Sequence, residues 1–244
     1  MKKISTLALI ASLSMSFAAV GSAEDALKPS TSTQVQVNQT KLSQRDIDGL
    51  KQGFTEFGVS PTTQESLIKK IEAGQLIDSI NPEMKDKGFA VETTAETEDS
   101  IIRTTKVTFP DGSVRVQNVS EPKQTIFPSA VEGGLKQCGS GYCTVTDATV
   151  SDSAVVFKAD FKASYTLVDG DFNDSISSVR DYHITTYGGT YSNADLKIDK
   201  QNESLEGPAR ASLRFAWTAW NGSTTSTYYL HLYVGNNKAT SQQG

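Results

Sequence analysis

The chain has 244 residues, with 23 Lys and Arg against 28 Asp and Glu, two His and two Cys. This length is sufficient for at least one ordinary hydrophobic core. A net charge of −5 argues against generic binding to nucleic acid or to an anionic membrane surface. Two histidines and two cysteines also exclude a disulfide-dense scaffold and leave little room for a zinc site.

Residues 1–23 have the pattern of a secretory signal peptide. A basic start, Lys2 and Lys3, precedes the apolar run of residues 4–20. The small residues at 21–23 are those that a signal peptidase reads, whereas the apolar run is short for a membrane anchor. Because the segment has two lysines and no acid, its removal changes the net charge from −5 to −7. We expect a secreted, extracellular protein without a membrane span after signal removal.

Residues 24–40 are rich in Ser, Thr, Gln and Lys, and this composition predicts a disordered tail. A helical hairpin is then predicted within residues 41–80. Its first helix begins at Ser43, with Asp46 three positions later, and ends near Gly58. The apolar stripe of this helix, at spacings of three and four, consists of Ile47, Leu50, Phe54 and Phe57.

The second helix has two possible starts, at Ser60 before Pro61 or at a capping box of Thr62 and Glu65. Gly74 is suited to cap its end. Its apolar face is formed by Leu67, Ile68 and Ile71. A hairpin of about 40 residues is too small to be confidently stable alone, so we expect it to pack against another part of the chain.

Two strands of a small β-meander follow the hairpin. Residues 101–109 and 113–119 are rich in β-branched side chains, and the Asp111-Gly112 pair between them is a strong hairpin signal. The alternation places the second strand's residues on two faces: Val114 and Val116 on one, Arg115 and Gln117 on the other. Residues 121–137 contain two Pro and two Gly, and we interpret them as a linker.

The strand pattern is clearest in the last hundred residues. Apolar side chains alternate with polar ones in three long runs, and two weaker runs lie between them: 155–167, 209–217 and 228–234, then 175–184 and 191–198. Strands of this kind, separated by Gly and Asn turns, predict an antiparallel β-sandwich. We therefore expect an α+β fold, with a helical hairpin and β-meander at 41–120 and a sandwich domain at 138–240.

The stretch FGVSPTTQESLI at residues 57–68, followed by Ala73-Gly74 and Asp78-Ser79, resembles a recurring segment of uncharacterised secreted proteins from Gram-positive bacteria. In those proteins a strand pair with Asp-Gly-Ser and then Glu-Pro follows, as at residues 111–113 and 121–122 here. A cysteine-flanked glycine loop and a C-terminal β-domain come last. The resemblance implies a bacterial, secreted protein in two parts, and it assigns no catalytic residue because the family has no known function.

Cys138 and Cys143 enclose the sequence Gly-Ser-Gly-Tyr. In an oxidising compartment, such a pair predicts a local disulfide. A redox site typically has two intervening residues rather than four, and a metal site would need two further ligands nearby. The chain-entropy model gives so small a ring only about 2 kcal/mol, so the bond would fix a loop rather than the domain.

An acidic turn follows the first long strand of the C-terminal part. Its four oxygen-bearing residues are Asp169, Asp171, Asn173 and Asp174. Alternating oxygens of this kind can bind Ca²⁺, but Asp174 and Arg180 occupy positions where an EF-hand loop needs Gly and Glu. A looser calcium loop remains one interpretation, and a hairpin turn that needs no metal is the other.

The polar sides of the last two strands combine aromatic and basic residues, and this combination makes them a candidate ligand face. The residues concerned are Trp220, Tyr229, His231, Tyr233, Arg210 and Arg214. Aromatic rings beside hydrogen-bonding groups suit a sugar ring or an extended peptide. The alternative is that the helical hairpin, or the strands within residues 89–119, cover this face.

The sequence carries no motif of an enzyme. It contains no Gly-x-Ser-x-Gly, His-Glu-x-x-His, P-loop or dinucleotide glycine fingerprint, and its two histidines, His183 and His231, are far apart. A hydrolase with a Ser/His or carboxylate site assembled from distant residues is the least favoured interpretation.

We predict a secreted, non-catalytic binding or interaction protein of the bacterial envelope or medium. Its partner would be cell-wall carbohydrate or another protein, with no nucleic acid and no cofactor other than the possible calcium ion. A bacteriocin-like or toxin-like antagonist is the alternative, because the tail and the glycine-interrupted helices suit a hairpin that moves or is cut.

Overall fold

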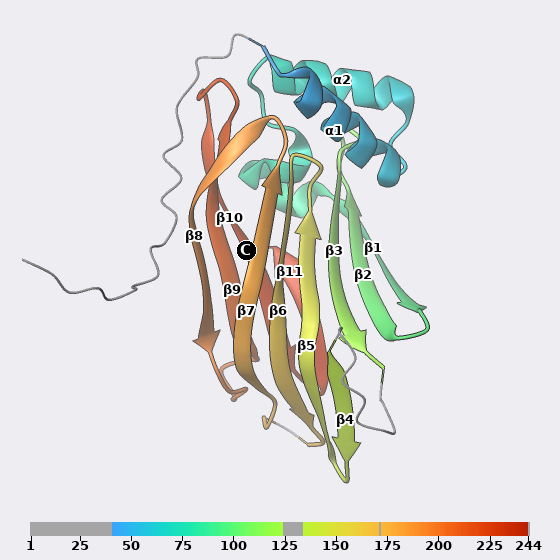
Figure 1. The fold of residues 1–244 in the computed structure, drawn as a ribbon, viewed down its shortest axis with the longest axis vertical. Coiled ribbons are helices and arrows are strands. Elements are labelled where there is room, and N and C mark those ends of the chain that lie inside the picture. The colour runs from blue at the N-terminus through green and yellow to red at the C-terminus, as the bar shows by residue number, and fades with distance from the viewer. Residues whose placement is uncertain (1–40, 124–133, 171, 244) are drawn as a thin grey trace, which may run out of the picture. The chain divides into compact units, whose positions relative to one another are not determined.

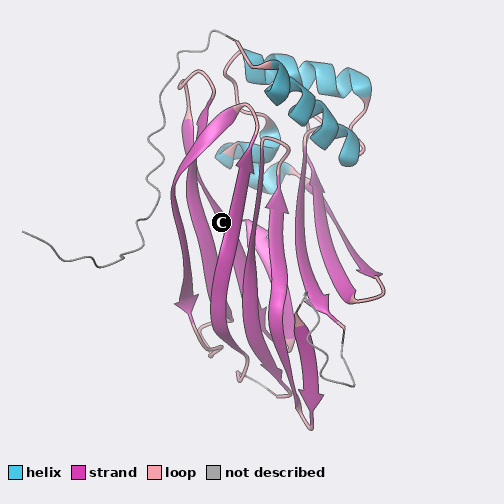
Figure 2. Cartoon of the chain, viewed as in Figure 1, coloured by secondary structure: helices cyan, strands magenta, loops and turns pink. Residues whose placement is uncertain are grey.

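The computed structural model describes residues 41–123, 134–170 and 172–243. These residues belong to one compact unit, built mostly from two antiparallel β-sheets with helices at one end (Figures 1 and 2). The predicted signal peptide, the predicted tail and most of the predicted linker lie outside the described residues. The coarse expectation of a chain that is mainly β-sheet with a helical N-terminal part is confirmed.

Two α-helices form where the apolar stripes predict them, and two 3-10 helices follow. Their bounds are α1 Gln44–Glu56, α2 Pro61–Glu72, η1 Asp78–Ile80 and η2 Pro82–Lys87. Ser43 caps α1 by accepting the Asp46 N–H at 3.2 Å, as expected. Ser60 caps α2 by accepting the Thr63 N–H at 3.3 Å, so the Ser60-Pro61 start is correct and the alternative capping box is not.

The larger sheet, sheet A, has the strand order β1-β2-β3-β5-β6-β7, and β4 pairs with one end of β5. Its strands are β1 Phe89–Glu96, β2 Ser100–Thr108, β3 Val114–Pro122, β4 Leu135–Gly139, β5 Tyr142–Ser153, β6 Phe157–Val168 and β7 Ser175–Thr186. The smaller sheet, sheet B, has the order β11-β10-β9-β8. Its strands are β8 Gly189–Lys200, β9 Ala209–Ala219, β10 Thr225–Gly235 and β11 Lys238–Gln243.

The β-meander does not form a unit separate from the C-terminal strands. β3 pairs with β5, with Val119 opposite Val150, so strands before and after the predicted linker lie in one sheet. The linker prediction is also wrong at its ends, because residues 121–122 belong to β3 and residues 135–137 to β4. The predicted boundary therefore does not separate two domains among the described residues. The reason is the long strand β5, whose pairing with β3 joins the two halves of the chain.

The hydrophobic core lies between the two sheets. Phe157 of β6 packs edge-on against Phe215 of β9, with ring centroids 5.2 Å apart, and both contact Tyr228 of β10. The side chains expected on the buried side of the three long alternating runs are buried here, because each run presents one face to the opposite sheet. Burying each large apolar side chain contributes about 1.5–3 kcal/mol.

Polar contacts join the helical end to the sheets. Lys70 of α2 forms ion pairs with Asp78 of η1 at 2.8 Å and with Asp111 of the β2–β3 turn at 2.9 Å. The Tyr228 hydroxyl, which comes from the core, donates to the Ile80 carbonyl at 2.7 Å. The helical hairpin thus obtains the packing partner that its small size requires.

Cys138 and Cys143 form the predicted disulfide. They lie opposite each other in the β4–β5 hairpin, with Cα atoms 4.0 Å apart. Gly141 in the turn has a φ of 79°, a conformation that glycine adopts without strain. The bond therefore fixes the tip of one hairpin, as expected from the short spacing.

Candidate functional site

The outer face of sheet B gathers five of the six residues predicted for the ligand face. Tyr229, His231 and Tyr233 alternate along β10 and point away from the core, because Tyr228, Leu230 and Leu232 fill the inner positions. The Tyr229 and His231 rings stack with centroids 5.5 Å apart, and His231 and Tyr233 are 5.7 Å apart. The three rings are partly buried and form a continuous row, which we call the aromatic row.

Two exposed arginines of the neighbouring strand β9 flank the aromatic row. Arg214 lies opposite Tyr229, and Arg210 lies opposite Tyr233. Arg210 donates its Nε–H to Asp199 of β8 at 3.2 Å, and Lys197 approaches the same carboxylate at 3.8 Å. Asp195 of β8 lies opposite Arg214, so three basic side chains and two acidic ones border the row on this side.

A serine, a histidine and an aspartate meet between the aromatic row and β8. Ser212 Oγ lies 2.7 Å from His231 Nδ1 and also hydrogen bonds to Asp199. In a Ser/His/Asp hydrolase the histidine lies between the other two and takes the serine proton. Here Ser212 lies between Asp199 and His231. The histidine therefore has no aspartate behind it to orient it as a base toward the serine. The three side chains form a hydrogen-bonded chain on the outer face of sheet B.

The pKa of His231 is lower than that of an ordinary histidine. Burial lowers the pKa of His231, and the positive charges of Arg210 and Lys85 lower it further, against the opposing effect of Asp199. The imidazole is therefore mainly neutral near pH 7. The second histidine, His183, is exposed on the outer face of sheet A, 3.3 Å from Asp160, so the two histidines do not form one site.

Trp220 does not belong to the face where the sequence analysis placed it. It follows β9 at the helical end, and its indole Nε1–H donates to the Ile71 carbonyl of α2 at 3.2 Å. For Trp220 the alternative interpretation, cover by the helical hairpin, fits better, because the turn after β9 directs the side chain toward α2. Tyr229 and Tyr233 stay partly accessible.

In the acidic turn, the carboxylate of Asp174 has a structural role. Asp174 is buried, and its two oxygens accept the N–H groups of Val168 at 2.7 Å and Asn237 at 2.8 Å. Asp169 accepts from the Asn237 side chain at 2.8 Å, and Asp171 lies outside the described residues. Asn173 contributes no carboxylate. Within the part of the chain that the structure describes, no group of three or more His, Cys, Asp or Glu side chains is arranged to hold a metal ion.

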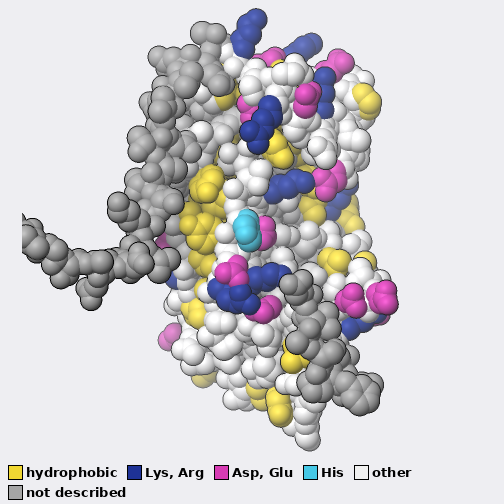
Figure 3. Space-filling view, viewed as in Figure 1, with side chains coloured by type: hydrophobic (Ala, Val, Ile, Leu, Met, Phe, Trp, Pro, Cys, Tyr) yellow, Lys and Arg dark blue, Asp and Glu magenta, His cyan; other side chains and the backbone are white. Residues whose placement is uncertain are grey.

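The outer face of sheet A contrasts with the aromatic row. Figure 3 shows this face over β5, β6 and β7, where basic and acidic side chains lie next to one another. Arg180 pairs with Asp147 at 2.7 Å, and Lys158 pairs with Glu56 at 2.8 Å. Exposed ion pairs of this kind contribute little to stability.

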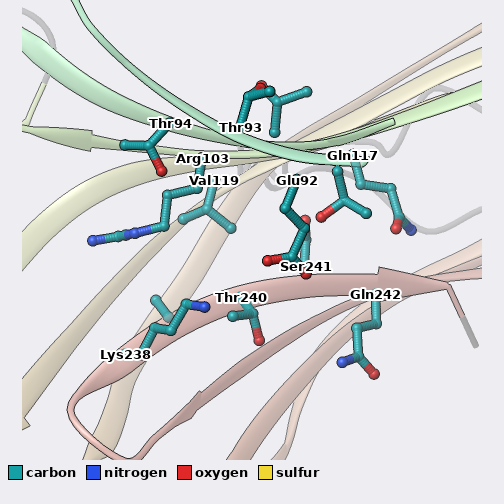
Figure 4. Close-up of a pocket in the computed structure, with 13 residues that line it drawn as sticks. Glu92, Thr93, Thr94, Arg103, Gln117, Val119, Lys238, Thr240, Ser241 and Gln242 are labelled. Carbon is teal, nitrogen blue, oxygen red and sulfur yellow. The ribbon is translucent and has the colours of Figure 1, made fainter. Parts of the chain in front are cut away.

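A groove that the sequence analysis did not predict lies where the two sheets diverge. Its volume is about 420 Å³, and its walls come from β1, β2 and β3 on one side and from β11 on the other (Figure 4). Glu92 points from β1 toward β11, and Arg103 and Lys238 add positive charge. No local motif signals such a groove, because it arises from the different widths of two sheets.

No family model, no curated protein and no solved structure matches this chain. Among the described residues, no helix is both long enough and apolar enough to cross a membrane.

Proposed function

We propose that this chain is an exported bacterial binding protein without catalytic activity, acting in the envelope or the medium. We interpret its two facing sheets as the predicted β-sandwich, with the outer face of sheet B as the ligand surface. The ligand that suits this surface best is an anionic polymer of the cell wall. The observation that carries the proposal is the aromatic row flanked by Arg210 and Arg214.

The chemistry of the surface supports an anionic, hydroxyl-rich ligand. Aromatic rings offer apolar area for the carbon skeleton of a sugar or polyol, and the phenol groups of Tyr229 and Tyr233 offer hydrogen bonds. Arginine matches phosphate and carboxylate groups with two parallel N–H donors. Arg210 and Arg214 lie on the same face of β9, four residues apart, or about 13 Å along an extended strand, so they can contact successive charged units of a polymer.

The test is titration calorimetry of the mature protein with poly(glycerol phosphate), and with neutral dextran as the uncharged comparison. We expect binding to the phosphate polymer and at least tenfold weaker binding by the Arg210→Ala/Arg214→Ala variant. Arg45→Ala, which removes an exposed arginine of α1, serves as the matched control and should leave binding unchanged. No binding at millimolar repeat units, or equal binding by both variants, would contradict the proposal.

A further inference from the structure

The backbone edge of β11 forms one wall of the groove. Lys238 to Gln242 of this strand line it (Figure 4). β11 pairs with β10 on one side and is the last strand of sheet B among the described residues. The backbone N–H and C=O groups on its other side therefore have no neighbouring strand within the part of the chain that the structure describes.

Sheet A extends beyond sheet B at this side of the molecule. β11 lies against β3, while β2 and β1 continue sheet A past it. The inner faces of β1 and β2 thus have no strand of sheet B opposite them. One further strand beside β11 would cover these inner faces and would continue the face-to-face packing of the two sheets.

A buried polar group in the groove lacks a partner. Gln117 of β3 lines the groove and is only 5% exposed, yet its Nε2 has no hydrogen-bond partner among the described residues. A buried donor without a partner costs about 1–3 kcal/mol, so native proteins rarely keep one without a use. An extended chain lying in the groove would bring carbonyl and side-chain oxygens into reach of this amide.

We infer that the groove accepts an extended segment of a partner polypeptide, which pairs with β11 as a fifth strand of sheet B. Main-chain hydrogen bonds to β11 supply affinity, and the walls select the side chains. Thr94, Thr105 and Gln117 offer neutral hydrogen-bonding groups. The charges of Glu92 and Lys238 are of opposite sign, and that of Arg103 is offset by its ion pair with Glu121 at 2.6 Å. The partner segment is therefore polar and nearly uncharged, rich in Ser, Thr, Gln or Asn, unlike the anionic ligand proposed for the outer face.

The experiment supplies the missing strand within the full chain. Asn-Gly replaces Gly244, and a six-residue strand, Thr-Gln-Val-Thr-Val-Thr, follows it, so that a tight turn can return the chain along β11. We expect hydrogen exchange in β11 to slow at least tenfold and Tm to rise by about 2–4 °C. A matched control has proline at the first, third and fifth positions of the added strand, which removes the N–H donors that would face β11. This control should show neither effect.

A second variant separates strand pairing from a general effect of the added segment. Gln117→Leu in the extended chain removes the buried amide, and we expect at least half of the Tm gain to disappear. A dimer that protects β11 would still support the inference, because the added strand would then enter the groove of a second copy. Unchanged exchange in β11, or equal protection in the proline control, would overturn the inference while leaving the proposed outer-face function untouched.

Discussion

Strand β3 of sheet A uses its inner face differently from sheet B. The inner face of sheet B is mainly apolar, with Leu213, Phe215, Leu230 and Leu232 all buried, and Ser241 is the buried polar residue beside Leu232. The inner face of β3 in sheet A instead carries Arg115, Gln117 and Glu121, which are also buried. Both faces pack against the same interior, so burial alone does not distinguish them.

The difference lies in how β3 compensates its polar groups. Arg115 donates its Nε–H to Asp152 Oδ1 at 2.8 Å and lies 5.4 Å from the Phe157 ring centre. Glu121 has partners too, whereas the Gln117 amide between these two residues lacks one and lines the groove. A polar strand can thus face a core where its groups have partners. Of the three buried side-chain atoms without a partner among the described residues, Ser79 Oγ, Gln117 Nε2 and Trp217 Nε1, the Gln117 amide is the one that lines the groove.

The strongest test of this contrast is Arg115. Arg115→Ala leaves Asp152 buried without its cation, and we expect a loss of about 3–5 kcal/mol in the free energy of unfolding. Denaturant unfolding at neutral pH measures the loss. The double variant Arg115→Leu/Asp152→Leu should recover most of it, because it removes both charges. If Arg115→Ala unfolds at the wild-type denaturant concentration, the buried pair does not distinguish the two faces.

Glu121 tests the same face through pH. Burial raises the pKa of Glu121, but hydrogen bonds from Arg103 at 2.6 Å and Tyr165 at 2.7 Å outweigh burial and hold the pKa below its ordinary value. A lowered folded-state pKa contributes stability above the unfolded value of about 4.5, and this stability is lost as pH falls below it. We expect Glu121→Gln to cost about 2–3 kcal/mol at pH 7.

The measurement for Glu121 is the free energy of unfolding from pH 7 to pH 3. The wild type should lose stability over the acid part of this range more steeply than Glu121→Gln does. If the free energy of unfolding changes with pH in the same way in both proteins, the ionised Glu121 carboxylate does not contribute to stability as proposed. Glu65→Gln, which changes an exposed glutamate of α2, is the matched control and should follow the wild type.

The disulfide tests how far the two sheets depend on their edges rather than on the core between them. Cys138→Ser/Cys143→Ser removes a ring of six residues at the tip of the β4–β5 hairpin. We expect a loss of about 2 kcal/mol, smaller than at Arg115, because a short ring restricts the unfolded chain little. Calorimetric Tm measures it. A loss as large as that of Arg115→Ala would mean that the hairpin tip holds the two sheets together.

The sequence was sufficient for the elements with strong local patterns. The α1 and α2 stripes, and the alternation in β6, β9 and β10, determine which side is buried because large apolar residues recur at one spacing. β5 was not predicted, because its apolar inner positions are only Val145, Ala148 and Val150, and the residues between them are mostly small and polar. This alternation is too weak to indicate a strand. Without β5, the pairing that joins the two halves of the chain was also missed.

The site was predicted in part for a related reason. Alternation along β9 and β10 placed Tyr229, His231 and Tyr233 beside Arg210 and Arg214, because register in a hairpin follows from local sequence. Trp220 lies beyond the alternating run, in a turn whose direction depends on α2. The groove depends on how many strands each sheet has, and this number cannot be predicted from any local sequence pattern.

The smallest expected effect belongs to His231, on the outer face. Burial comes first among the causes that lower the pKa of His231, so the folded protein binds this proton less well than the unfolded chain does. Stability should therefore fall as pH drops below about 6.5, by less than about 1 kcal/mol because solvent screens a half-accessible group. His231→Gln should abolish this small slope, and His183→Gln, at the exposed histidine of sheet A, should retain it. Protonation also adds positive charge between Tyr229 and Tyr233, in addition to that of Arg210 and Arg214 on the neighbouring strand, so wild-type affinity for poly(glycerol phosphate) should rise from pH 7 to pH 5. An affinity that stays constant over this range would place the phosphate contacts away from the aromatic row.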